Sequence, residues 1–131
     1  MNTKLLMSVS AIILGTLGLL LTFLPQEILA YIDSDAATLL PVILQLLGAA
    51  YLGFAMLNWM AKGNLIGGVY SRPVAIGNLA HFLISGLALL KAASNTEGSP
   101  ALWVTGAIFI TLALLFGYVT FTHPGKGVAK V

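Results

Sequence analysis

The chain has 131 residues, of which 59% are apolar and 8% charged, with six basic residues, four acidic residues and no cysteine. Because a soluble domain has about 25% charged residues, this composition excludes an ordinary water-soluble globular protein. The lack of cysteine excludes disulfides, thiolate metal sites and cysteine nucleophiles, and a net charge of +2 gives no reason to expect nucleic acid as a partner.

Four apolar runs follow one another along the chain, at about residues 5–24, 38–61, 74–94 and 101–122. Each reaches the roughly 20 residues that a helix needs to cross a bilayer core of about 30 Å. Prolines stand at or near the ends of the runs, where a missing amide hydrogen is tolerated. The sequence therefore predicts an all-α fold, an integral membrane bundle of four antiparallel transmembrane helices, as a single transmembrane domain over residues 1–131.

The first run also has to be compared with a secretory signal, because Lys4 precedes it. Its apolar part is about 20 residues long, which exceeds the apolar core of a signal peptide. The segment Ile28-Leu29-Ala30 is also a poor match to a cleavage site with small residues. We therefore expect an uncleaved membrane span.

The charged residues are sorted between alternate connections. If both termini and the middle loop are inside, the basic residues on that side are Lys4, Lys62, Arg72, Lys126 and Lys130. Only Lys91 then lies near the other face, and the acidic residues Glu27, Asp33, Asp35 and Glu97 all fall outside. Since cytoplasmic loops carry the excess of Lys and Arg, this arrangement predicts a multi-pass protein of the cell inner (cytoplasmic) membrane, with N and C termini cytoplasmic.

Small or hydroxylated residues recur at helical spacing on every run. Helices in lipid associate through close backbone approach and interhelical hydrogen bonds, so we expect these stripes to face other helices; lining a ligand cavity is the alternative. The stripes are Ser8, Ala11, Gly15, Gly18 and Thr22; Gly48, Ala49 and Gly53; Gly77, Ser85 and Gly86; and Gly106, Ala113, Gly117 and Thr120.

A polar layer is predicted toward the inner side of the second and third runs. Asn78, His81 and Ser85 are spaced by three and four residues, which places them on one helix face. Asn58 lies at a similar depth, and Tyr51 shares its face. Because ionisable residues inside a membrane are costly and mark function, these five residues form the candidate ligand-binding site. The alternative is structural: a neutral His81 bonds to Asn58 or to a backbone carbonyl and locks the two spans.

The middle loop, residues 62–73, is basic and glycine-rich but lacks the lysine and hydroxyl residue of a phosphate-binding loop. Its Lys62 and Arg72 are candidates for holding an anionic lipid headgroup, and an ordinary positively charged turn is the alternative. His123 is the only other histidine, and no carboxylate belongs to the inner side. We therefore predict no metal site, no catalytic residue and no cofactor.

The segment 47–53, the basic loop and Asn78-Leu79-Ala80-His81 resemble the small four-helix DoxX-like bacterial membrane proteins. The resemblance implies the four-helix architecture, and some members of that group are linked to quinone-dependent oxidoreductases. It supplies no catalytic residue for this chain.

The predicted function is that of a small non-enzymatic integral membrane protein, either an accessory subunit of a membrane complex or a binder of a lipid-like ligand. One alternative is a small oligomeric transporter or channel. Another is a quinone-linked redox component, in which His81 donates to a quinone carbonyl. Membrane lipid is the expected partner, and a homo-oligomer or a larger membrane complex is left open.

Overall fold

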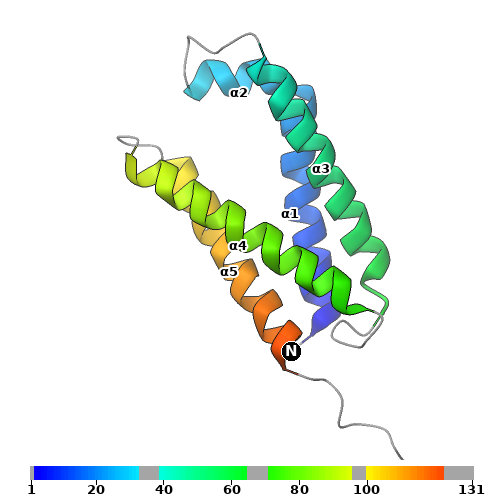
Figure 1. The fold of residues 1–131 in the computed structure, drawn as a ribbon. Helices are drawn as coiled ribbons and strands as arrows, with labels where there is room; N and C mark the ends of the chain where they lie inside the picture. Colours follow the sequence, from blue (N-terminus) through cyan, green and yellow to red (C-terminus); the bar gives the residue numbers. More distant parts are fainter. Residues whose placement is uncertain (1, 33–38, 65–70, 96–99, 123–131) are drawn as a thin grey trace, which may run out of the picture. The chain divides into compact units, whose positions relative to one another are not determined.

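A computed structural model describes residues 2–32, 39–64, 71–95 and 100–122. Along this part of the chain the helices are α1 (Thr3–Phe23), α2 (Pro25–Ile32), α3 (Leu40–Ala61), α4 (Arg72–Asn95) and α5 (Pro100–Phe121) (Figure 1). All except α2 are long and apolar enough to cross a membrane. The all-α class and the four long helices are thus confirmed, with ends within two residues of the prediction. They indicate a multi-pass membrane protein.

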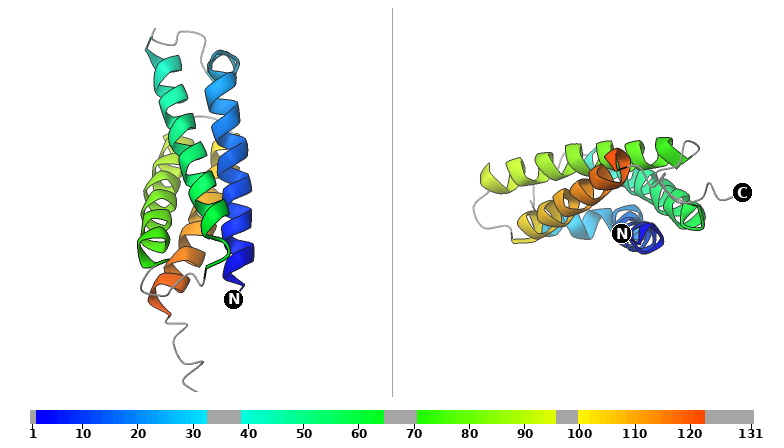
Figure 2. Two further views of the ribbon diagram at one scale, coloured as in Figure 1. Left: turned by 90° about the vertical axis from the view of Figure 1, so that its right-hand side faces the viewer. Right: turned by 90° about the horizontal axis from the view of Figure 1, so that it is seen from below.

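The chain divides into two compact units. The first unit, Leu5–Lys62, contains α2, α3 and nearly all of α1; the second unit, Gly63–Val131 with Met1–Lys4, contains α4 and α5. Within the first unit α1 and α3 lie side by side, and within the second α4 and α5 do (Figures 1 and 2). A single transmembrane domain over residues 1–131 stays a prediction.

The short helix α2 lies within the segment that the sequence indicated as a plain connection. Backbone hydrogen bonds run from Leu24 N to Leu20 O, 2.9 Å, and from Ile28 N to Leu24 O, 3.1 Å. Pro25 between them has no amide hydrogen to donate, which interrupts the helix but suits its first position. α2 therefore turns away from the axis of α1 (Figures 1 and 2), with Leu29 buried and Glu27 exposed.

The helices α1 and α3 approach each other through glycines. A Cβ built on Gly18 would lie 3.0 Å from the backbone O of Gly48 and 3.0 Å from the backbone N of Leu52. A Cβ on Gly48 would lie 2.9 Å from the backbone O of Gly18 and would collide with the Thr22 hydroxyl. The two backbones are thus so close that only glycine fits, as expected for helix association in lipid.

Gly53, which the sequence assigned to the close-approach surface of the second span, takes no part in the contact between α1 and α3. A Cβ on Gly53 would meet nothing within 4 Å, and Ala49 is likewise exposed. Five residues after Gly48, a helix has turned by about 140° beyond one full turn, so Gly53 points elsewhere. The buried face of α3 consists of Gly48, Tyr51, Ala55 and Asn58.

The helices α4 and α5 run in opposite directions and approach each other at Gly86 and Gly106. A Cβ on Gly86 would lie 2.9 Å from Ile110 Cδ1 and 3.1 Å from its backbone N, and one on Gly106 would lie 2.8 Å from Leu90 Cδ2. Nearer the start of α4, Leu79 faces Gly117, where an added Cβ would lie 3.6 Å from Leu79 Cδ1. The predicted stripe residues Gly86, Gly106 and Gly117 therefore face the neighbouring helix of the same unit.

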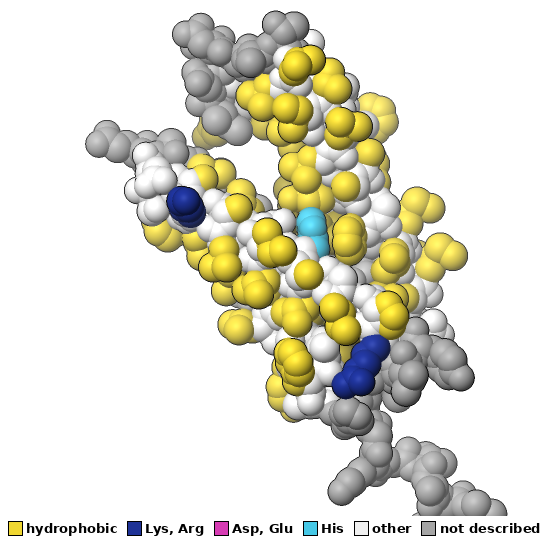
Figure 3. Space-filling model, in the orientation of Figure 1, with side chains coloured by type: hydrophobic (Ala, Val, Ile, Leu, Met, Phe, Trp, Pro, Cys, Tyr) yellow, Lys and Arg dark blue, Asp and Glu magenta, His cyan; other side chains and the backbone are white. Residues whose placement is uncertain are grey.

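The long helices expose large apolar side chains, and hydrophobic side chains are spread over the face drawn in Figure 3. Examples are Ile12, Leu46, Ile84 and Leu114. Two threonine hydroxyls of α5 are satisfied within their own helix: Thr111 Oγ1 donates to Ala107 O at 2.8 Å, and Thr120 Oγ1 to Phe116 O at 2.7 Å. Exposed apolar side chains, and hydroxyls that bond within their own helix, suit a hydrocarbon solvent.

Candidate functional site

The predicted polar layer divides between the two units, with Tyr51 and Asn58 on α3 and Asn78, His81 and Ser85 on α4. The prediction that the two groups meet would join the units and stays a prediction. Inside each unit, however, the structure gives these side chains definite surroundings.

In the first unit, Asn58 is part of a buried polar chain between two helices. Asn58 on α3 donates from Nδ2 to the hydroxyl of Ser10 on α1, at 3.0 Å. That hydroxyl in turn donates to the backbone O of Met7, at 3.0 Å. Asn58 and Ser10 are completely buried, and Tyr51 is buried two turns earlier on the same face. The pair can hold α1 against α3, because a polar group in an apolar interior is stable only when hydrogen-bonded.

Ser10 was not among the residues that the sequence singled out. Of the predicted stripe on the first span, Ala11 and Gly18 are buried. The buried face also contains Leu6, Met7, Ser10 and Leu14, and Ser10 is the partner of Asn58. The signal is the helical spacing of Ser10 from Met7 and Leu14, and it becomes visible only when the register between α1 and α3 is known.

In the second unit, Asn78 bonds to its own helix. Its side chain is completely buried, and Nδ2 donates to Val74 O at 2.9 Å. His81 and Ser85 are both half-buried, one and two turns further along α4. On the predicted common face of these three residues, Asn78 is therefore buried, whereas His81 and Ser85 are partly exposed.

The ring of His81 borders an aromatic cluster that the sequence analysis did not identify. The ring centroids of His81 and Phe82 are 5.3 Å apart in an edge-to-face arrangement, and those of His81 and Phe109 are 6.0 Å apart. Phe82 also packs edge-to-face on Phe109 at 5.2 Å and stacks on Phe116 at 5.7 Å. All three phenylalanines are completely buried. They form the aromatic core between α4 and α5.

The residues predicted to hold an anionic headgroup have different surroundings. Lys62 Nζ lies 2.8 Å from the centroid of the Trp59 ring in the first unit, which is a cation–π contact. Arg72 is the first residue of α4 in the second unit and is exposed. A joint role in holding one headgroup stays a prediction.

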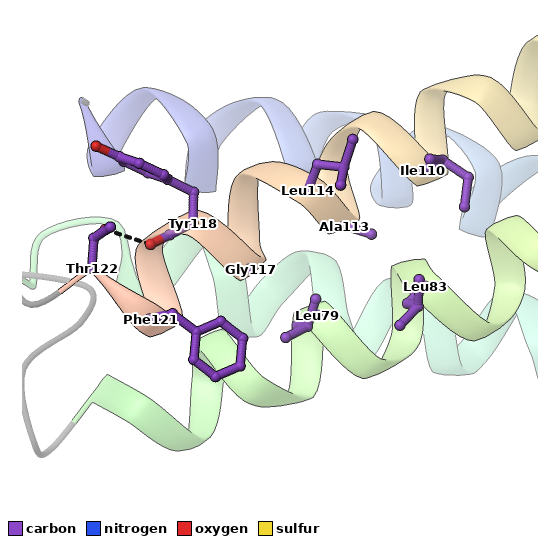
Figure 4. Close-up of a pocket in the computed structure, with 9 residues that line it drawn as sticks. All are labelled: Leu79, Leu83, Ile110, Ala113, Leu114, Gly117, Tyr118, Phe121 and Thr122. Atoms are coloured by element: carbon purple, nitrogen blue, oxygen red, sulfur yellow. Dashed lines mark hydrogen bonds between the residues drawn. The ribbon is translucent and has the colours of Figure 1, made fainter.

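The second unit contains a groove along α4 and α5 with a volume of about 490 Å³ (Figure 4). We call it the α4/α5 groove. It is lined by Leu79, Leu83, Ile110, Ala113, Leu114, Gly117, Tyr118, Phe121 and Thr122. Leu79 and Leu83 project from α4 toward α5, and Phe121 projects from the end of α5 toward α4 (Figure 4).

The groove is apolar except at one end. The ring of Tyr118 points away from α4 (Figure 4), and the hydroxyl of Thr122 donates to the backbone O of Tyr118. Gly117 leaves the wall open, since a Cβ there would make only an ordinary contact, 3.6 Å from Leu79 Cδ1. Such a lining can bind an apolar chain by contact and by burial of its surface.

A second, smaller hollow of about 270 Å³ belongs to the first unit. It is lined by Ala11, Ile12, Ala55, Met56, Trp59 and Met60.

Among the described residues, no group of three or more His, Cys, Asp or Glu side chains is placed to hold a metal ion. Six of the ionisable residues considered in the sequence lie outside the described residues: Asp33, Asp35, Glu97, His123, Lys126 and Lys130.

No protein-family model matches the chain, and neither a curated protein nor a solved structure is similar enough to match it. The resemblance to DoxX-like proteins accordingly stays a prediction that rests on the residues quoted for it.

Proposed function

We propose that this chain is a non-enzymatic multi-pass protein of the cytoplasmic membrane, in which α1, α3, α4 and α5 cross the bilayer as an antiparallel bundle. Both termini lie in the cytoplasm in this proposal. Its support is the charge asymmetry of the sequence, with five of the six basic residues on one side, together with four helices of spanning length and apolar character.

We further propose that the protein binds a lipid-like ligand in the α4/α5 groove. The observation that carries this proposal is the groove itself, about 490 Å³ in volume and lined by side chains that are nearly all apolar. Small-molecule sites are typically concave, mostly apolar and about 300–1,000 Å³ in volume. An elongated hydrocarbon chain suits a hollow that follows two helices, and every lining residue belongs to one unit.

The test uses a phosphatidylcholine that carries a photoactivatable group in its acyl chain. After irradiation of the detergent-purified protein, we expect the label mainly on peptides of α4 and α5. Gly117→Phe should remove this labelling, because the ring would occupy the groove while its Cβ still fits beside Leu79. Gly53→Phe is the matched control, since it adds the same ring at a position with nothing within 4 Å.

Both variants should unfold at a temperature close to that of the unmodified protein, which would show that the loss of label does not reflect unfolding. Labelling that is spread evenly over all helices, or that Gly117→Phe leaves unchanged, would contradict binding in the groove.

The role of an accessory subunit stays a prediction. Native mass spectrometry of the protein, extracted gently from its membrane, would identify co-purifying subunits and bound small molecules in one measurement.

A further inference from the structure

We propose that the α4/α5 groove takes one anionic phospholipid, with an acyl chain in the groove and the phosphate at the Arg72 guanidinium. This inference rests on the proposed binding of a lipid-like ligand and names its class. The inference is based on the position of Arg72 on α4, on the charges of α4 and α5, and on the length of the groove.

Arg72 lies on the face of α4 that lines the groove. It precedes Leu79 by seven residues, close to two helical turns, so the two side chains leave nearly the same face about 10 Å apart along the axis. Ile76 and Leu83 continue this stripe at helical spacing, and Ile76 is exposed. The apolar face of α4 that lines the groove therefore continues along the helix to Arg72.

The same end of the groove is formed by the end of α5. Leu79 faces Gly117, and Gly86 faces Ile110, so positions further toward the start of α4 lie beside positions further toward the end of α5. Beyond Gly117 in that direction come Tyr118, Phe121 and Thr122. Arg72 is thus at the end of the groove that contains its only two side-chain hydroxyls.

The charges of the two helices favour an anion at this end. Neither α4 nor α5 contains an acidic residue, and their cations are Arg72 and Lys91, at opposite ends of α4. Arg72 is exposed. An arginine guanidinium presents a planar set of donors that matches the oxygens of a phosphate, so an accessible Arg72 is suited to a phospholipid headgroup.

The groove has the length of one leaflet. From Ile110 to Thr122 the axial distance is about 18 Å at 1.5 Å per residue, compared with about 15 Å for half of a bilayer core. One acyl chain can therefore lie along it with its headgroup at the membrane surface. With both termini cytoplasmic, this is the inner leaflet, whose surface carries anionic lipids. The Tyr118 ring also suits an interfacial position.

The experiment compares retention of phosphatidylglycerol and phosphatidylcholine with identical acyl chains, measured by native mass spectrometry of the full chain in detergent. We expect the unmodified protein to retain phosphatidylglycerol about fivefold better, the effect of one basic residue near an anionic surface. Arg72→Gln should abolish this preference and leave phosphatidylcholine retention unchanged. Lys91→Gln, the same charge change at the other end of α4, should preserve it.

Three results would overturn the inference, and they are distinguishable. Equal retention of the two lipids by the unmodified protein, with both lost in Gly117→Phe, would reject the headgroup assignment and leave groove binding intact. Equal loss of the preference in Arg72→Gln and Lys91→Gln would likewise reject a localised headgroup site. Retention of neither lipid above the level of Gly117→Phe would reject the proposed function as well.

Discussion

The two units hold their helices together by different means. In the first, α1 and α3 bring their backbones into contact at Gly18 and Gly48 and add a buried hydrogen bond from Asn58 to Ser10. In the second, α4 and α5 also approach closely at Gly86 and Ile110, but they pack around an aromatic core in which Phe82 contacts Phe109 and Phe116. The first pair leaves a hollow of about 270 Å³, and the second leaves one of about 490 Å³.

The difference shows two ways in which apolar helices can associate in a membrane. Apolar side chains gain little by leaving lipid for protein, so helices must gain from packing or from hydrogen bonds. Backbone contact and a polar bond fix the α1/α3 pair at a short separation, where an added atom has no room to move. Side chains between α4 and α5 keep the backbones further apart at Gly117 and leave the α4/α5 groove there. Substitutions should therefore have their largest effect in the first unit.

The largest effect is expected for Gly18→Leu. The added side chain meets backbone atoms of Gly48 and Leu52, which cannot rotate away. The free energy of unfolding should fall by an amount near the upper end of the range typical of overpacking, which is about 1–3 kcal/mol. Thermal unfolding in one detergent, followed by circular dichroism, would measure it. Gly53→Leu is the matched control on α3 and should leave the midpoint nearly unchanged, and an equal loss in both variants would contradict the packing described for α1 and α3.

An intermediate effect is expected for Phe82→Leu in the second unit. The substitution removes the ring contacts with Phe109 and Phe116, each worth about 0.5–1.5 kcal/mol beyond its buried area, but leaves an apolar side chain in place. The midpoint of thermal unfolding should fall clearly, though less than in Gly18→Leu. Ile84→Ala, which changes an exposed residue of the same helix, should have little effect. A midpoint unchanged by Phe82→Leu would mean that the aromatic cluster does not stabilise the α4/α5 pair.

The smallest of these effects is expected for the hydrogen bond between Ser10 and Asn58. A double-mutant cycle with Ser10→Ala and Asn58→Leu isolates their coupling from the other contacts of each residue. We expect a coupling of about 0.6 kcal/mol, the average for hydrogen bonds between membrane helices. Additive effects of the two substitutions would show that the bond contributes nothing to the α1/α3 pair.

The long helices could be predicted because their signal is local. About 20 apolar residues between prolines indicate a span whatever the neighbours are, and all four helices were found within two residues of their predicted ends. The helix α2 was missed because eight residues are too few to show a helical pattern. A helix that short depends on tertiary contacts rather than on its own propensity, and Leu29 is buried in the structure.

The site was less predictable because it depends on which residues of neighbouring helices face each other. The burial of Asn58 and Asn78 follows from polar residues in an apolar run, and both are completely buried. The partner of Asn58, the rings around His81 and the α4/α5 groove all depend on which residues of two helices face each other. A single sequence does not contain that register. The same limit explains Gly53, which was grouped with Gly48 by proximity along the chain although the two point in different directions.

The central claim is that four helices cross the membrane with both termini in the cytoplasm, since this places Arg72 at the inner surface. The chain has no cysteine, so single cysteines can be labelled without background. Four exposed residues at the ends of the helices are suitable: Asn2, Glu27, Asn64 and Asn95. With an impermeant maleimide on spheroplasts, we predict labelling of Glu27→Cys and Asn95→Cys, and labelling of Asn2→Cys and Asn64→Cys only after permeabilisation. Labelling of Asn64→Cys without permeabilisation would contradict the account.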